Sequence, residues 1–395
     1  MRELKDKKII LGITGSIAAY KVFELIKLLK NSEAKVFPIL TQAATKFITP
    51  LTVEVIAQTK VYIDIFEEPL LHTKLTKEAH LFLVAPATAN LINKYATGIA
   101  DDLLTTSLLT FRGPVIIAPA MNSRMYESQQ VQKNIQYLKS IGIKFIEPEV
   151  GALACGEEGV GRLAKVERIF EAVVSEFTEK DLKNEHILVT AGPTREYIDS
   201  IRFITNKSSG KMGYALAKIA KRRGAKVILV SGPSSIEHPA VDSFIEVETT
   251  SQMLDAVMGN IDEATVLIMA AAPLDFKPIE KFEKKIDKSS INSIPIKLNP
   301  DILKEVSKLK KRPFTVGFAA EDGLNIERAK RKLNEKKLDM IVLNDIATGF
   351  NSDTNEGVII FKRNDKYFEE KIPLVSKEEF SSLILTKVLE LKVGF

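Results

Sequence analysis

The chain passes twice through the same order of elements: a short apolar run, a glycine-rich turn and a helical stretch. The first pass begins with KKIILGI at 7–13 and the second with HILVTAGPT at 186–194, and further apolar runs of strand length follow in each half. Uninterrupted apolar strands that alternate with helices are typical of parallel sheets covered on both faces. We therefore predict an α/β protein with two doubly wound domains.

The polar segment EFTEKDLKNE at 176–185 separates the two passes and is predicted to contain the end of a helix and a linker. A length of 395 residues fits two or three domains. We place the boundary near residue 183, which gives domains at 1–183 and 184–395.

Composition excludes several classes of protein. The net charge of +5 is spread over the chain, and no basic segment is interleaved with aromatic residues, so we expect no binding of nucleic acid. A single cysteine and the absence of a signal-like start favour a reducing cytoplasm, and no apolar run approaches the roughly 20 residues of a membrane span. Neither half contains G-x-G-x-x-G or a P-loop, which makes a dehydrogenase or P-loop kinase an unlikely interpretation.

Polar residues follow several strands of the first half. In GITGSIAAYK, Gly15, Ser16 and Ile17 lie at a predicted helix start, where backbone N–H groups can hold a phosphate. On this motif alone, an ordinary helix cap is the favoured interpretation of Ser16. Ligands bind at the carboxyl ends of strands in open α/β sheets, where Thr41 is also predicted to lie. The segment that begins with APATAN adds Thr88, Asn90 and the turn at 98–101.

Three further side chains of the first half could take part in catalysis. Cys155 lies in GALACGEEGVGR, a turn so rich in glycine that the thiol is either reactive or incidental rather than part of a core. His72 lies in an amphipathic segment and could be a surface histidine. Asn122 follows the apolar run PVIIAPA and brings an amide to the edge of the predicted sheet.

The second half offers a comparable set of positions. Asn206 precedes a helix that we expect to be capped by serine within 208–213, and Asp275 is predicted to end a strand. The segment NPDI at 299–302 and the segment GFAAE lie at predicted ends of elements, while Lys332 and Lys336 share one face of a helix. Each position has an ordinary structural interpretation as a turn, a cap or solvated surface.

Taken in order, GSIAAYK, HTKL, APATAN, GIADDL, PAMN and LACGEEGVGR resemble the flavin-dependent cysteine decarboxylases. The whole chain resembles a bifunctional family of coenzyme A biosynthesis, in which phosphopantothenoylcysteine decarboxylase is fused to phosphopantothenate–cysteine ligase. The resemblance implies a flavodoxin-like flavoprotein domain followed by a Rossmann-like nucleotide-binding domain.

For the first half, the resemblance implies FMN held by Gly15, Ser16, Ile17, Thr41, Thr88, Asn90 and the loop at 98–105. It also implies that FMN oxidises the substrate thiol, which provides an electron sink for the loss of CO2. His72 would help to deprotonate the substrate, Asn122 would hold the substrate carboxylate, and Cys155 would supply the final proton. Arg162 is a candidate partner for a carboxylate or phosphate.

For the second half, the resemblance implies a CTP-dependent ligase that joins 4′-phosphopantothenate to cysteine through an acyl-cytidylate, with Mg2+ on the triphosphate. Asn206 would hold the acyl-cytidylate, and Lys285 would neutralise phosphoryl charge. Because the flap reads Lys285-Ile286-Asp287-Lys288 rather than Lys-x-Lys-Lys, Lys284 or Lys288 could serve instead. The implied CTP contacts are Asp275, Lys285, Asn299, Pro300, Asp301, Ile302, Phe318, Lys332 and Lys336.

The resemblance further implies a homo-oligomer with trimeric decarboxylase halves, in which a neighbour lends His72, and dimeric ligase halves. A rival interpretation is a non-catalytic flavin-binding regulator of the same fold, which would lack the histidine, asparagine or cysteine. A cysteine decarboxylase of lantibiotic type would leave the second half unexplained.

Overall fold

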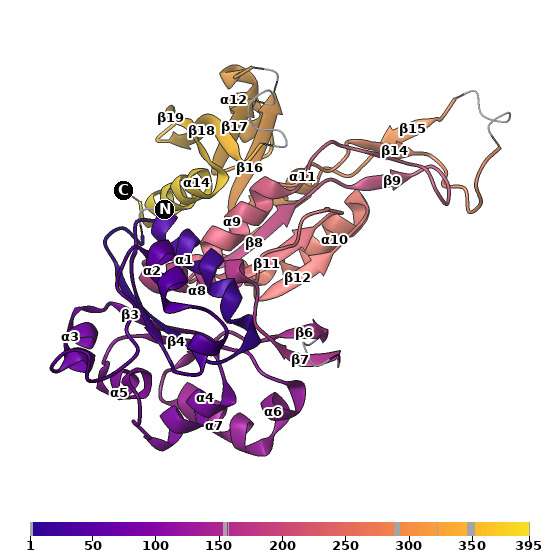
Figure 1. The fold of residues 1–395 in the computed structure, drawn as a ribbon. Helices are drawn as coiled ribbons and strands as arrows, with labels where there is room; N and C mark the ends of the chain where they lie inside the picture. Colours follow the sequence, from indigo (N-terminus) through magenta and orange to yellow (C-terminus); the bar gives the residue numbers. More distant parts are fainter. Residues whose placement is uncertain are drawn as a thin grey trace. The chain divides into compact units, whose positions relative to one another are not determined.

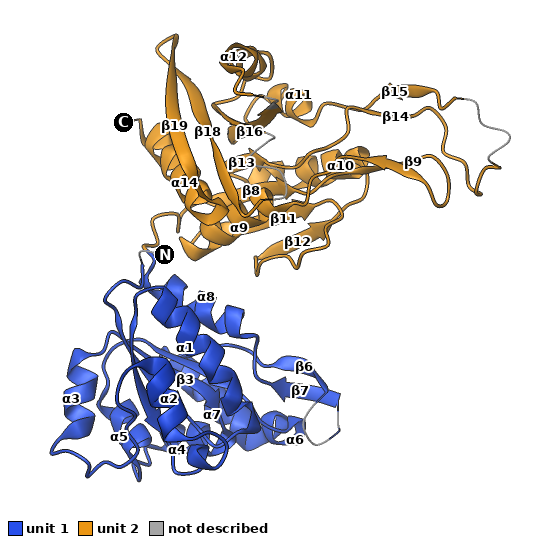
Figure 2. Ribbon diagram, turned by 45° about the horizontal axis from the view of Figure 1, so that its top comes forward, with its two compact units in different colours: residues 1–178 blue, residues 179–395 orange. Residues whose placement is uncertain are grey.

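The computed structural model describes residues 3–152, 156, 158–287, 293–321, 323–345 and 352–394. The chain forms two compact units, residues 1–178 and residues 179–395 (Figure 2). The chain therefore divides between Thr178 and Glu179, a few residues before the boundary that we placed near residue 183.

The first unit is built on a parallel sheet with strand order β2-β1-β3-β4-β5. This is the order of flavodoxin-like folds. The sheet strands are β1 (Lys8–Ile13), β2 (Lys35–Leu40), β3 (Leu81–Ala87), β4 (Val115–Pro119) and β5 (Lys144–Phe145). The helices are α1 (Val22–Asn31), α2 (Pro50–Ala57), α3 (Leu71–Glu78), α4 (Ala89–Thr97), α5 (Leu103–Thr110), α6 (Ser123–Glu127), α7 (Gln129–Ser140) and α8 (Val166–Phe177), with 3-10 turns η1 (Ile17–Lys21) and η2 (Ala44–Lys46). A separate hairpin consists of β6 (Glu149–Ala152) and β7 (Glu158–Arg162).

The second unit contains an eight-stranded sheet with order β12-β11-β8-β13-β16-β17-β18-β19. Its first six strands are parallel and follow the 3-2-1-4-5-6 order of Rossmann folds, whereas β18 and β19 are antiparallel. The strands are β8 (His186–Ala191), β11 (Lys226–Ser231), β12 (Ser243–Glu246), β13 (Val266–Met269), β16 (Phe314–Glu321), β17 (Met340–Asp345), β18 (Thr354–Arg363) and β19 (Lys366–Ser376). The helices are α9 (Lys211–Arg222), α10 (Thr250–Asn260), α11 (Ile302–Ser307), α12 (Ile326–Glu335) and α14 (Lys377–Val393), with the 3-10 turn η3 (Ile261–Glu263).

Two short antiparallel pairs extend from the second sheet and form what we call the arm (Figure 1). They are β9 (Arg195–Tyr197) with β10 (Phe203–Thr205), and β14 (Phe276–Pro278) with β15 (Ile296–Leu298). Strands β9 and β14 lie side by side, so the two pairs are neighbours along the arm.

Alternating side chains of the strands supply two cores in each unit. Ile9 and Leu11 of β1 are buried against α1, α2 and α8, whereas Ile10 faces α3, α4, α5 and α7. In the second unit Val189 of β8 packs toward α9 and α14, and Leu188 packs toward α10, α11 and α12. Both faces of each sheet are covered, and the predicted α/β class with two doubly wound sheets is confirmed.

One local prediction of an element was wrong, and several strands were not predicted. The stretch GSIAAYKVFELIKLLK is not one helix but the 3-10 turn η1 followed by α1. The antiparallel strands β18 and β19 and the three short strand pairs were not predicted, because they lack the long apolar runs of a doubly covered parallel sheet.

Candidate active sites

In the first unit, three loops meet at the carboxyl ends of β1, β2 and β3. The backbone N–H of Thr41 donates to the carbonyl of Ile13 at 3.0 Å, and the N–H of Thr88 donates to Oγ1 of Thr14 at 3.0 Å. Strand β1 lies between β2 and β3, so the chain reverses its winding direction between β1 and β3. Open α/β sheets bind ligands at this switch point.

The loop after β1 has the features that a flavin phosphate and ring require. Ser16 accepts from the N–H of Ala18 at 3.3 Å and caps η1, as the ordinary interpretation of this serine predicts. Gly15 lies against Ala43, whose Cβ would be 2.5 Å from a Cβ at position 15. The side chains of Ile17 and Tyr20 remain more than half exposed at this edge and offer an apolar surface to an aromatic ring. These residues therefore fit FMN.

Two cations also lie close to this loop. Burial and, after it, the field of Arg162 lower the pKa of Lys21, the last residue of η1. Since Arg162 ends β7, the loop after β1 and the hairpin β6–β7 lie near each other. Glu149, Glu167 and Glu24 also act on Lys21, so this edge carries charges of both signs.

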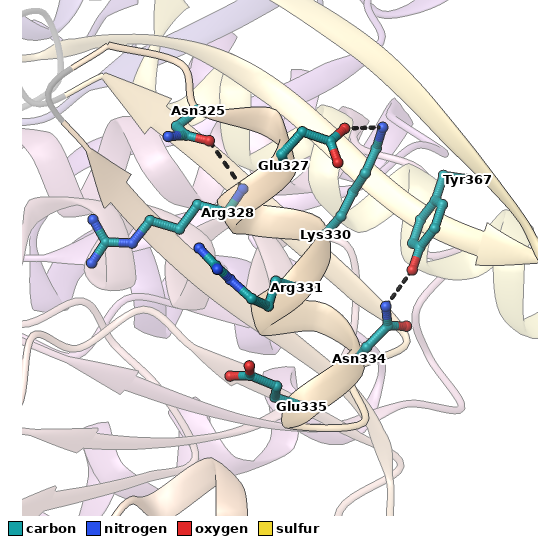
Figure 3. Close-up of a pocket in the computed structure, with 8 residues that line it drawn as sticks. All are labelled: Asn325, Glu327, Arg328, Lys330, Arg331, Asn334, Glu335 and Tyr367. Carbon is teal, nitrogen blue, oxygen red and sulfur yellow. Dashed lines mark hydrogen bonds and ion pairs between the residues drawn. The ribbon is translucent and has the colours of Figure 1, made fainter.

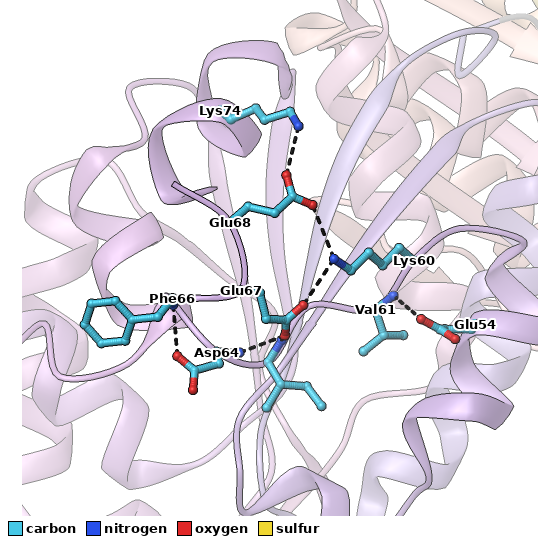
Figure 4. A network of polar contacts seen from close by, with 9 residues as sticks. Glu54, Lys60, Val61, Asp64, Phe66, Glu67, Glu68 and Lys74 are labelled. Atoms are coloured by element: carbon cyan, nitrogen blue, oxygen red, sulfur yellow. Dashed lines mark hydrogen bonds and ion pairs between the residues drawn. The ribbon is translucent and has the colours of Figure 1, made fainter. Parts of the chain in front are cut away.

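A network of charged side chains holds the segment that leads into α3, the helix of His72 (Figure 4). Lys60 forms ion pairs with Glu67 at 3.3 Å and with Glu68 at 3.2 Å, and Glu68 also pairs with Lys74 of α3 at 2.9 Å. Hydrogen bonds from Lys74 and Lys60 lower the pKa of Glu68. Single exposed pairs stabilise a fold weakly, but here Glu68 pairs both with Lys60 and with Lys74, so the network links the preceding loop to α3 through Lys74.

His72 carries a buried ring nitrogen that needs a partner. Its Nδ1 atom is buried and forms no hydrogen bond within the described part of the chain. Leaving such an atom unpaired costs free energy, typically about 1–3 kcal/mol. Helix α3, which carries His72, packs on α5.

Asn122 lies at the base of the hairpin that leads to Cys155. It caps α6, because its Oδ1 accepts from the N–H of Arg124 at 2.9 Å. The neighbouring N–H of Met121 donates to the carbonyl of Gly161 in β7 at 3.0 Å. Cys155 belongs to the connection between β6 and β7 and lies outside the described residues. The structure thus joins Asn122 to the hairpin whose connection contains the cysteine.

In the second unit, the corresponding switch point lies between β8 and β13. Asn206 Nδ2 donates to the carbonyl of Ala272 at 2.9 Å and to that of Pro273 at 3.4 Å, so the asparagine reaches the loop after β13. We predicted a serine cap at the start of α9, and this prediction was wrong. Gly210, with φ of +81°, occupies the cap position. A Cβ at Gly213 would lie 2.5 Å from Cβ of Ala191, so α9 packs closely on the end of β8.

The residues that the resemblance assigns to CTP fall into two connected groups. Lys332 Nζ donates to the carbonyl of Phe318 at 3.0 Å, and Lys336 forms an ion pair with Asp301 at 2.9 Å. The second group includes Asn299, whose backbone N–H donates to the carbonyl of Asp275 at 2.8 Å. Asn299, Pro300, Asp301 and Ile302 are consecutive, so the two groups meet in this segment.

Some positions differ from those predicted. Asp275 does not end a strand, because β13 stops at Met269 and Asp275 directly precedes β14. Phe318 lies inside β16 rather than at its end. Lys336 is the C-cap residue of α12 rather than a residue within the helix.

Two buried carboxylates of the arm were missed by the sequence analysis. Glu196 of β9 is buried and accepts from Nδ2 of Asn299 at 3.0 Å, and Asp199 is fully buried beside Arg202. Their only sequence signal is the density of charged residues in TREYIDSIR, which also describes an exposed loop. Lys285 is exposed in the arm, and Lys288 lies outside the described residues.

A hollow of about 610 Å³ on the outer surface of α12 is not part of this site (Figure 3). Its Lys330 forms ion pairs with Glu327 and Glu369 at 2.9 Å, and Asn334 donates to the hydroxyl of Tyr367. Neither Lys332 nor Lys336 lines it. The described residues contain no cluster of three or more metal-ligating side chains and no helix long and apolar enough to cross a membrane.

Comparisons with known proteins agree with the two units. Residues 1–178 match the family model described as Flavoprotein, and residues 182–391 match the DNA/pantothenate metabolism flavoprotein C-terminal domain. A solved C-terminal domain of the coenzyme A biosynthesis bifunctional protein CoaBC is 37% identical, with a TM-score of 0.46, and covers 54% of this chain and 98% of that one.

Full-length relatives cover both units at once. The coenzyme A biosynthesis bifunctional protein CoaBC of Bacillus subtilis (strain 168) is 42% identical over 400 residues, covering 98% of each chain. The protein of the same name from Escherichia coli (strain K12) is 39% identical over 399 residues, covering 98% of this chain and 97% of that one. The resemblance drawn from the motifs is confirmed, and the chain belongs to the CoaBC family of bifunctional coenzyme A biosynthesis proteins.

Proposed function

We propose that the second unit joins 4′-phosphopantothenate to cysteine with CTP and that the first unit, with FMN, decarboxylates the product to 4′-phosphopantetheine. The observation that carries this proposal is that Gly15, Thr41 and Thr88 lie in the loops at the switch point of the first sheet, and that Asn206 reaches the loop after β13 at the switch point of the second. His72, Asn122 and Cys155 are all present in the sequence, which argues against a non-catalytic flavin-binding regulator.

In the ligase reaction, a carboxylate oxygen of 4′-phosphopantothenate attacks the α-phosphorus of CTP, and the bond to pyrophosphate breaks. The amine of cysteine then attacks the acyl carbon, CMP leaves and the amine loses a proton. Lys285 would stabilise phosphoryl charge in the first step together with Mg2+, and Asn206 would hold the acyl group in the second. The segment 299–302, Phe318, Lys332 and Lys336 would bind the nucleotide.

In the decarboxylation, Gly15, Ser16, Ile17, Thr41, Thr88 and Asn90 would hold FMN at the edge of the first sheet. Bound FMN would supply a two-electron oxidation of the substrate thiol and the later return of those electrons. Asn122 would hold the substrate carboxylate, His72 would accept a proton, and Cys155 would donate the proton that completes the product.

The purified full-length protein tests both halves of the proposal. We expect a yellow protein with flavin absorption bands, release of pyrophosphate that requires CTP and 4′-phosphopantothenate and continues beyond one turnover only with cysteine, and release of CO2 from added phosphopantothenoylcysteine. A colourless protein that neither gains colour nor activity with FMN would contradict the first assignment. Pyrophosphate release that does not depend on 4′-phosphopantothenate would contradict the second.

We also propose a closed homo-oligomer in the cytoplasm, with first units arranged as trimers and second units as dimers. The family resemblance, in which a neighbour lends His72, supports a site completed by a neighbouring subunit. Light scattering should therefore give a mass well above that of one chain. A monomer that retains full decarboxylase activity would contradict the shared site.

A further inference from the structure

The arm of the second unit contains a carboxylate that is removed from solvent. Asp199, in the turn between β9 and β10, is fully buried. Its Oδ1 accepts from the backbone N–H groups of Ile201 at 2.9 Å and Arg202 at 2.7 Å. Its Oδ2 accepts from Nε and Nη2 of Arg202 at 2.8 and 2.6 Å. The bonds from Arg202 hold the pKa of Asp199 well below its usual range, so the carboxylate is ionised at neutral pH.

The same pair holds one residue of the opposite segment of the arm. The N–H of Ile286 donates to Oδ2 of Asp199 at 3.2 Å, and Nη2 of Arg202 donates to the carbonyl of Ile286 at 2.7 Å. Asp199 and Arg202 therefore fix both the N–H and the carbonyl of Ile286. We call this pair of side chains the clasp. A further bond, from the N–H of Phe282 to the carbonyl of Ile198 at 3.0 Å, joins the same two segments.

The clasp lies between two residues assigned to the ligase reaction. Ile286 directly follows Lys285, and Arg202 directly precedes β10, which leads into Asn206. A side chain on an exposed segment such as that of Lys285 can reach a phosphoryl group reproducibly only if its backbone is held. The clasp supplies this restraint, because it fixes the residue next to Lys285 to the strand that leads to Asn206.

We propose that Asp199 is a positioning residue of the ligase, which holds Lys285 in register with Asn206 through Arg202 and the backbone of Ile286. This inference rests on the proposed ligase function of the second unit. Asp199 itself is buried within the arm and acts on the substrates only through the residues that it holds.

The test uses the full-length enzyme with Asp199→Asn. Asparagine has the same shape, but its NH2 group must face either the backbone N–H groups of Ile201 and Arg202 or the guanidinium of Arg202 and the N–H of Ile286. In both orientations donors oppose donors, and the negative charge that pairs with Arg202 is lost. The matched control is Asp339→Asn. Asp339 also accepts from two nitrogens of one arginine, Arg312, and from a backbone N–H, that of Thr315 at 2.7 Å, but it lies at the amino end of β17.

We expect Asp199→Asn to lower kcat and kcat/KM of pyrophosphate release together, by roughly tenfold to a hundredfold. Hydrogen–deuterium exchange should rise in the peptide covering residues 281–287 and stay unchanged in β8 and β11, which also shows that the unit is folded. Decarboxylation of added phosphopantothenoylcysteine should be unaffected. Asp339→Asn should keep both the ligase kcat and the exchange of 281–287.

Unchanged exchange in 281–287, an unchanged ligase kcat, or an equal loss of kcat in Asp339→Asn would each overturn the proposal. If the unmodified enzyme released no pyrophosphate from CTP, the proposed ligase function would fail instead. The exchange experiment would still decide whether Asp199 restrains Ile286.

Discussion

Replacing Gly161 with alanine should abolish most decarboxylase activity and leave ligase activity intact. A Cβ at position 161 would lie 2.2 Å from the carbonyl oxygen of Met121, and the glycine has φ of +146°, which alanine rarely adopts. The hairpin β6–β7 would have to move away from Met121 and Asn122, and with it the connection that contains Cys155. Displacement of a catalytic group by about 1 Å can cost a hundredfold in rate, so CO2 release should fall by roughly that factor or more.

Gly142→Ala is the matched control for this prediction. Gly142 also has a positive φ, +94°, but nothing lies within 4 Å of the Cβ that alanine would add. Gly142→Ala should therefore lose only about 1–2 kcal/mol of folding free energy through backbone strain. We expect a lower melting temperature and near-normal CO2 release. Equal loss of decarboxylase activity in both variants would mean that the contact between β7 and Met121 is unimportant for catalysis.

The general architecture could be predicted from the sequence because its signal is local and repeated. An apolar run such as LFLVAPA at 81–87 is buried on every residue, as the interpretation of a strand covered on both faces requires. The polar residues after β1, β2 and β3 could then be assigned to one edge, since parallel strands share their carboxyl ends.

The arm could not be predicted in the same way. The strands β9, β10, β14 and β15 have three residues each, too few for a periodic pattern. Asp199 is fully buried although aspartate is ordinarily exposed. Arg202 neutralises its charge, and a further bond comes from Ile286, which lies far along the chain. A contact of this kind leaves no trace in the spacing of either segment.

The start of α9 shows a different limitation. Ser208 and Ser209 precede the helix, and serine is a favoured cap residue, so the prediction of a serine cap followed the local preference. Gly210 takes the position instead because a Cβ there would approach the backbone of Gly192 to 3.3 Å. The requirement comes from a loop that belongs to another strand.

Lys285→Gln and Asn206→Asp should stop the ligase at different steps. Without the cation of Lys285, phosphoryl charge is uncompensated, and loss of such a stabilising group typically costs about 3–4 kcal/mol. Both pyrophosphate release and amide formation should then fall by two to three orders of magnitude. Lys284→Gln and Lys288→Gln are the controls within the same flap and should retain most activity.

In Asn206→Asp, a carboxylate oxygen replaces the Nδ2 atom that donates to the carbonyls of Ala272 and Pro273. Two acceptors cannot bond to each other, so the loop after β13 loses its link to Asn206. Since Lys285 and the 299–302 segment remain, we expect pyrophosphate release to continue in the first turnover while the acyl-cytidylate accumulates, which chromatography of quenched reactions would detect. If Lys285→Gln made the cytidylate at the normal rate and Lys288→Gln did not, the lysine that acts on the phosphoryl group would be Lys288, and the register that we assign to the flap would be wrong.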